Sequence, residues 1–220
     1  MIKCCIFDLD GTVLDTVSTI THYVNFILEK HGIDKITTEE CKYFAGNGAR
    51  LLMERSLKSK GITDRELVES LLNEYQNAYN ANPFYLTKLF DGIAELLSEL
   101  KARGIKIALV SNKPDSAVKP IAERFFGDAF DAALGGVDGI PLKPDTAMPK
   151  AVLSKLGIHE SETAWIGDTS VDIETGKNLG VSLNIGVLWG FRKIDELLGA
   201  GADTVVSSAD EILSAVVSVK

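Results

Sequence analysis

The sequence predicts an α/β fold in which a parallel-sheet core carries an inserted, all-helical domain. Short apolar segments alternate with helical ones from about residue 93 onward. Strands that are apolar throughout are typical of parallel sheets covered by helices on both faces. Residues 15–86, by contrast, read as helices without a convincing strand. Roughly ninety residues separate the first apolar strand from the next long one, far more than the dozen or so that a simple crossover needs. We therefore expect an insertion after the first strand.

The N-terminal elements follow from apolar spacing and helix-end signals. Residues 2–7 form an apolar run that predicts a short buried strand, and the apolar side chains of residues 16–29 recur at helical spacing. Asp64 is expected to cap a longer helix, which Asn82-Pro83 ends. The helices predicted in this part of the chain cover residues 16–29, a short stretch from residue 38, 49–60 and 64–79.

The elements after residue 92 alternate between helix and strand. Helices are expected over residues 93–102, 116–126, 146–156 and 171–179, and from residue 209. Strands are expected over residues 105–110, 130–134, 163–166, 181–187 and 204–206. Connected through helices, these strands favour one parallel sheet with helices on its two faces.

Composition narrows the class of partner. The chain has 220 residues, 45% of them hydrophobic, and a formal net charge of -8, which argues against nucleic acid or an anionic membrane as a partner and favours a small molecule. No apolar run reaches the roughly 18 residues of a membrane span, and the N-terminus does not read as a secretory signal. We expect a cytoplasmic protein, a monomer or a homodimer. Its three cysteines do not predict a disulfide framework, and its three histidines have no zinc-like spacing.

Two carboxylates come directly after the first predicted strand. Asp8 and Asp10 are two residues apart, so on an extended segment they point the same way and can address one small volume. Carboxylate oxygens suit a hard cation such as Mg²⁺, which often takes substrate phosphate as a further ligand. Polar residues also follow three later strands, where ligands of open parallel sheets bind. These are Ser111-Asn112, Lys143 and Gly167-Asp168.

In this order, these residues resemble the motifs of the haloacid dehalogenase superfamily, specifically its phosphatase branch with a helical cap after the first strand. The four motifs stand here as Asp8-Leu9-Asp10-Gly11-Thr12, Ser111-Asn112, Lys143-Pro144 and Gly167-Asp168-Thr169-Ser170-Val171-Asp172. A single Asp-x-Asp is weak, but four motifs in order on the expected elements are specific. The resemblance implies a Rossmann-like core of residues 1–14 and 87–220, and an all-helical cap domain of residues 15–86.

The resemblance also implies a role for each motif residue. Asp8 would be the nucleophile that forms an aspartyl-phosphate, and Asp10 the general acid and base. Mg²⁺ would be held by Asp8, the Asp10 backbone carbonyl and Asp168. Lys143 would bridge Asp8 and the phosphate, while Ser111 and Asn112 would bind phosphoryl oxygens. Asp172 either supports the metal or is an exposed Asp favoured by the helix dipole.

The cap sequence says less about the substrate. Residues 44–50 place Asn47 and Gly48 before a helix and resemble the cap loop of phosphoglycolate phosphatases. Helix N-terminal amides there, with Arg50, would receive a small carboxylate. The alternative is a plain turn followed by an exposed arginine. The expected function is a Mg²⁺-dependent phosphomonoester hydrolase that acts on a small phosphorylated metabolite such as 2-phosphoglycolate.

Other functions stay open at this point. A sugar-phosphate mutase shares all four motifs, although Thr12 stands where mutases tend to have an aliphatic residue. A dehalogenase has no need of an acid at Asp10. A phosphonate hydrolase would want a cap lysine, and residues 45–53 contain none. A non-catalytic phosphometabolite-binding module would differ from an enzyme in showing no metal-dependent turnover.

Overall fold

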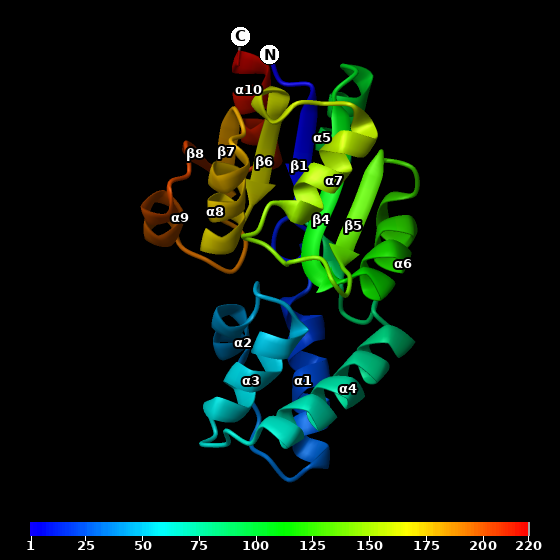
Figure 1. Ribbon diagram of the computed structural model, residues 1–220, viewed down its shortest axis with the longest axis vertical. Helices are drawn as coiled ribbons and strands as arrows, with labels where there is room; N and C mark the ends of the chain where they lie inside the picture. The colour runs from blue at the N-terminus through cyan, green and yellow to red at the C-terminus, as the bar shows by residue number, and fades with distance from the viewer. Residues whose placement is uncertain (220) are drawn as a thin grey trace.

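The computed structural model describes residues 1–219 and contains a six-stranded sheet with helices packed beside it (Figure 1). The strand order is β5-β4-β1-β6-β7-β8, and every neighbouring pair is parallel. The strands are β1 (Cys4–Phe7), β4 (Lys106–Pro114), β5 (Ala132–Gly136), β6 (Thr163–Gly167), β7 (Leu183–Val187) and β8 (Thr204–Val206). The predicted α/β class is confirmed.

Helices bury both faces of this sheet. The apolar side chains of α5 (Ile93–Ala102), α6 (Asp115–Phe126) and α10 (Ala209–Ser218) pack with one face. Those of α7 (Ala147–Leu156) and α8 (Ser170–Leu179) pack with the other face. Side chains alternate between the faces along a strand, and accordingly Cys5 belongs to the first cluster and Cys4 to the second. All three cysteines are buried and free.

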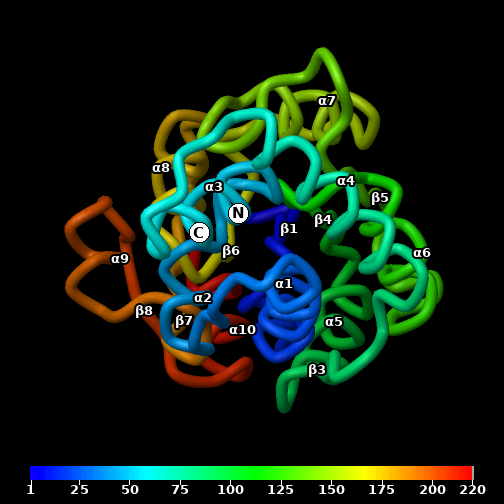
Figure 2. Tube along the Cα trace, turned by 90° about the horizontal axis from the view of Figure 1, so that it is seen from below, coloured from blue at the N-terminus to red at the C-terminus, as the bar shows by residue number. Residues whose placement is uncertain are grey.

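Four helices lie beyond the carboxyl ends of the strands (Figure 1). They are α1 (Val17–Lys30), α2 (Thr38–Phe44), α3 (Ala49–Lys58) and α4 (Arg65–Ala81), and we call them the helical segment. Seen from their side, they lie in front of the ends of the sheet strands (Figure 2). Asp64 caps α4 as predicted, since its side chain accepts hydrogen bonds from the backbone N–H groups of Glu66 and Leu67.

Some elements differ from those expected. β4 runs on to Pro114, because the chain beyond Val110 pairs with Gly136 of β5 after a shift in register. The short strands β2 (Leu14–Asp15) and β3 (Lys88–Leu89) were not expected, and they pair antiparallel where the chain enters and leaves the helical segment. Helix α9 (Ile194–Ala200) and the 3-10 turn Glu160–Glu162 were also not expected. Among the described residues, no helix is both long and apolar enough to cross a membrane.

Candidate active site

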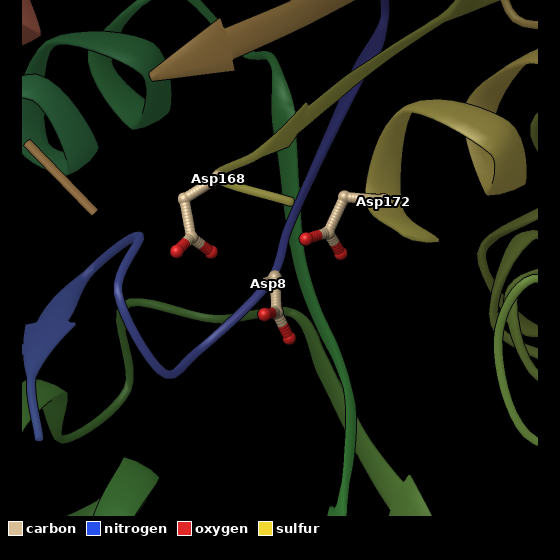
Figure 3. Close-up of side chains that lie close together, drawn as sticks. All are labelled: Asp8, Asp168 and Asp172. Carbon is tan, nitrogen blue, oxygen red and sulfur yellow. The ribbon is translucent and has the colours of Figure 1, made fainter. Parts of the chain in front are cut away.

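Three buried carboxylates meet at the carboxyl end of the sheet (Figure 3). Asp8 follows β1, Asp168 follows β6, and Asp172 lies in the first turn of α8. One carboxylate oxygen from each lies within 4.8 Å of the others. The central strands of a parallel sheet end side by side, and for this reason residues 160 positions apart share one site.

Lys143 is the cation of this cluster. Its buried Nζ lies 2.8 Å from Asp8 Oδ1 and 2.6 Å from Asp172 Oδ1, and 5.5 Å from the centre of the Trp165 ring. Burial alone would lower the pKa of Lys143, but Asp172 and Asp8 outweigh burial and raise it above its ordinary value. The lysine therefore stays charged at neutral pH.

One ammonium does not balance three carboxylates. Burial raises the pKa of Asp8 to about 6, against the lowering effect of Lys143 and with a further rise from Asp172. Burial, followed by the charges of Asp172 and Asp8, also raises the pKa of Asp168 well above its ordinary value. Asp8 Oδ1 contacts Lys143 but accepts no hydrogen bond of good geometry from residues 1–219. Hard oxygen donors with an excess of negative charge fit a divalent cation such as Mg²⁺.

Hydrogen bonds fix Asp168. Thr12 Oγ1 donates to Asp168 Oδ1 at 3.1 Å, and the Phe191 backbone N–H donates to Asp168 Oδ2 at 2.8 Å. Gly11 has φ +84°, and a Cβ there would lie 2.2 Å from Asp168 Oδ2. Only glycine fits such a position, so Gly11 keeps the Asp10 turn close against the carboxylate.

Asp172 is buried, and the interpretation of it as an exposed residue is therefore wrong. Its Oδ1 pairs with Lys143, and its Oδ2 accepts hydrogen bonds from the Thr169 backbone N–H and hydroxyl. With Thr169 as N-cap, this is the capping box of α8. One carboxylate thus joins the start of the helix to the cluster.

Ser111 and Asn112 lie at the end of β4 and line a cavity between the sheet and the helical segment. The Asn112 side chain is already engaged: its Nδ2 donates to the backbone oxygens of Gly46 and Lys143. Its Oδ1 accepts from the Lys143 backbone N–H at 2.7 Å. Asn112 therefore braces both the Lys143 loop and the loop before α3.

The same cavity is lined by Asp8 and Asp10 from the core and by Tyr75, Gln76, Tyr79 and Asn80 of α4. The Asp10 carboxylate does not join the three-carboxylate cluster. It pairs instead with Lys113, whose Nζ lies 3.0 Å from both carboxylate oxygens. Of Asp10, the backbone carbonyl is the group left as a candidate metal ligand.

The three residues predicted to bind substrate near the start of α3 do not lie together in the structure. Gly48 lines the cavity, whereas Asn47 accepts a hydrogen bond from Arg55 through its Oδ1 at 2.8 Å. Arg50 does not line this cavity. It pairs with Glu69, is 52% exposed, and borders a separate hollow between α3 and α4.

Two basic residues, Lys113 in the cavity and Arg192 at the contact with α2, were missed by the sequence reasoning. Lys113 directly follows Ser111-Asn112, and the continuation of that motif was a usable signal. Arg192, in the loop after β7, donates hydrogen bonds to the backbone oxygens of Lys42, Tyr43 and Ala45 at the end of α2. No local pattern marks Arg192, because its partners lie about 150 residues away.

Comparison with known proteins gives consistent results. Residues 5–185 match the family model of the haloacid dehalogenase-like hydrolases. The chain is 34% identical over 195 residues to a phosphoglycolate phosphatase of Psychrobacter arcticus, which covers 85% of this chain and 84% of the relative. It is also 34% identical over 181 residues to phosphoglycolate phosphatase 1 of Pseudomonas aeruginosa, with 80% of this chain and 65% of the relative covered.

A solved structure agrees over the whole chain. A protein of Lactobacillus delbrueckii subsp. bulgaricus, named as a candidate phosphoglycolate phosphatase, superposes with a TM-score of 0.93 at 32% identity. The superposition covers 97% of this chain and 98% of that one. The likeness therefore includes the helical segment as well as the sheet.

Proposed function

Since the chain belongs to the haloacid dehalogenase-like hydrolase family and is a phosphatase, we propose that it hydrolyses a small phosphomonoester, with 2-phosphoglycolate as the substrate, in a Mg²⁺-dependent reaction. The observation that carries this proposal is that Asp8, Lys143 and Asp168 lie together at the carboxyl ends of the central strands, beside the cavity. Asp8, Asp168 and the Asp10 backbone carbonyl are the proposed metal ligands, with Asp172 in support.

In the proposed first step, a carboxylate oxygen of Asp8 attacks phosphorus, and the bond from phosphorus to the ester oxygen breaks. Asp10 gives its proton to the departing alkoxide. In the second step, Asp10 takes a proton from water as that water attacks the aspartyl-phosphate, which returns Asp8 and releases phosphate. When bound, Mg²⁺ supplies positive charge that offsets the repulsion between the carboxylate and the phosphate.

Lys143 and the end of β4 complete the proposed phosphate site. The ammonium of Lys143 already contacts Asp8 and offers charge to the incoming phosphoryl group. The Ser111 hydroxyl lines the cavity and is a second candidate donor. Asn112 contributes to phosphate binding only if its side chain exchanges a present partner, since its amide is held by Gly46 and Lys143.

We propose that residues 15–86 act as a cap domain that excludes water and selects the substrate over a core of residues 1–14 and 87–220. The cavity that α4 closes over Asp8 supports this division. The names of the relatives support 2-phosphoglycolate. Cytoplasmic residence, and a monomeric or homodimeric state, stay predictions.

The test is phosphate release from a panel of phosphorylated metabolites, with Mg²⁺ and with EDTA. We expect turnover with Mg²⁺ alone, 2-phosphoglycolate among the preferred substrates, and a rate about 10²–10⁴ lower in Asp10→Asn. Absence of turnover on every ester would favour a binding module. A sugar phosphate that is isomerised without release of phosphate would favour the mutase.

A further inference from the structure

Lys113 brings one positive charge into the cavity above Asp8. It lies in the last part of β4, and its side chain is 7% exposed. Its Nζ contacts both oxygens of Asp10 at 3.0 Å and lies 4.4 Å from the centre of the Tyr79 ring on α4. Core and helical segment therefore meet around this ammonium.

The other side chains around the cavity make Lys113 distinctive. Within residues 1–219, it is the one positively charged side chain that lines the cavity. The side chains that the helical segment contributes to the cavity lining carry no charge. They are apolar or aromatic or end in a neutral amide, and they include Leu52, Tyr75 and Gln76. In such surroundings a charged group of the ligand must find an opposite charge, because desolvation without one is costly.

The contact between Lys113 and Asp10 indicates where the ammonium would lie beside a bound ester. In the proposed function, Asp10 meets the oxygen of the leaving group. Lys113 touches the same carboxylate, so its Nζ faces the first few atoms beyond that oxygen. In 2-phosphoglycolate the carboxylate carbon is only two bonds from the ester oxygen. An ammonium has three donors, and those of Lys113 can be shared between Asp10 and a substrate carboxylate.

We infer that Lys113 binds a carboxylate on the leaving group and thereby selects phosphomonoesters of small hydroxy acids over neutral esters of the same size. This inference rests on the proposed function and assigns to Lys113 the carboxylate-binding role expected above for the amides at the start of α3 together with Arg50. Arg50 is unsuited to it, since it faces Glu69 outside the cavity.

The first test uses the unmodified protein with Mg²⁺ and compares two substrates of matched size. These are 2-phosphoglycolate and phosphoglycolamide, in which a neutral amide replaces the carboxylate. We expect kcat/KM to be about 100-fold higher for 2-phosphoglycolate, as for other sites in which a buried charge loses its partner. A ratio near one, with both esters hydrolysed, overturns the inference and leaves the proposed function standing. No hydrolysis of any ester overturns both.

The second test separates substrate selection from a mere effect on Asp10. In Lys113→Met, we expect the ratio between the two substrates to fall to near one. If both rates fall in parallel and the ratio is kept, Lys113 only positions Asp10 and the inference is overturned.

Lys119→Met is the matched control, because Lys119 lies on α6 with its side chain 66% exposed; it should keep the ratio of the unmodified protein. Should Lys113→Met not fold, Lys113→Gln takes its place, with the same fall of the ratio to near one expected and a ratio that is kept overturning the inference.

Discussion

The guanidinium of Arg192 lies over the ring of Tyr43, with its central carbon 5.6 Å from the ring centroid. Arg192 belongs to the core and Tyr43 to α2, so this contact ties the helical segment to the sheet domain. The side chain of Arg192 is 9% exposed, and Glu196 holds its Nε at 3.1 Å. The guanidinium of Arg192 donates hydrogen bonds to backbone oxygens at the end of α2. The last carbonyl groups of a helix have no hydrogen-bond partner within the helix.

Replacing Arg192 with Met should loosen this attachment. Hydrogen bonds from a charged group contribute roughly 1.5–3 kcal/mol, and we expect kcat/KM to fall about tenfold with a lower melting temperature. Steady-state kinetics and thermal denaturation would measure both. Arg124→Met, on the exposed face of α6, is the control. Unchanged kinetics in Arg192→Met would show that the contact has no part in closing the cavity.

Asp8→Asn should abolish turnover and yet stabilise the metal-free fold. The amide cannot attack phosphorus, so phosphate release should stop. Burial holds the pKa of Asp8 at about 6, so the ionised form is disfavoured by the fold at neutral pH. Removing that charge should raise the melting temperature in EDTA by about 2–4 °C. Residual normal activity would refute the assignment of Asp8 as nucleophile.

Lys143→Met should cost both activity and stability. Asp8 and Asp172 would lose their shared partner, and breaking a buried ion pair from one side destabilises by about 3–5 kcal/mol. Urea denaturation measures the loss. The double variant Lys143→Met/Asp172→Asn should regain part of the stability and none of the activity. Recovery of activity in the double variant would contradict a role for Lys143 in catalysis.

Mg²⁺ should stabilise the protein more at neutral than at acid pH. The folded protein binds the Asp8 proton more tightly than the unfolded chain does, since the pKa of Asp8 is raised from 3.8 to about 6. The stabilisation of the fold by that proton is complete below pH 3.8 and is lost as the pH rises through about 6. On the proposed function, Mg²⁺ bound by Asp8 has to displace the same proton, so its stabilising effect should grow over this pH window.

Melting curves at about pH 5 and about pH 7.5, with Mg²⁺ or with EDTA, test this pH dependence. At a Mg²⁺ concentration about 100 times Kd, the gain at neutral pH is about 2.7 kcal/mol. NaCl at equal ionic strength controls for salt. An equal gain at both pH values would contradict the coupling between metal and proton.

The parts of the site that sequence could predict are those tied to strand ends. Asp8 and Asp168 directly follow two adjacent strands, whose ends the parallel sheet brings together, and Lys143 reaches Asp8 from the connection after β5. Asp172 follows Asp168 by four residues and lies in the first turn of the helix expected over residues 171–179. For Asp8 and Asp168 local pattern and general sheet geometry are enough, whereas the prediction for Lys143 depends on the resemblance to the family.

The remaining features depend on contacts that no local pattern encodes. The direction of Arg50 depends on which side of α3 faces the cavity, and the structure turns it toward Glu69. Lys113 meets Asp10 across 103 positions of sequence. Strand β2 is two residues long, and its pairing with β3 exists only once the chain between them has folded.

The pairing of Leu14 with Leu89 and of Asp15 with Lys88 holds the two ends of the intervening chain side by side. Residues 16–87 begin and end at one place, so the length of the helical segment can vary without moving the strand ends that carry Asp8 and Asp168. On the proposed function, the part of the chain that selects the substrate and the part that carries out phosphoryl transfer could therefore change separately.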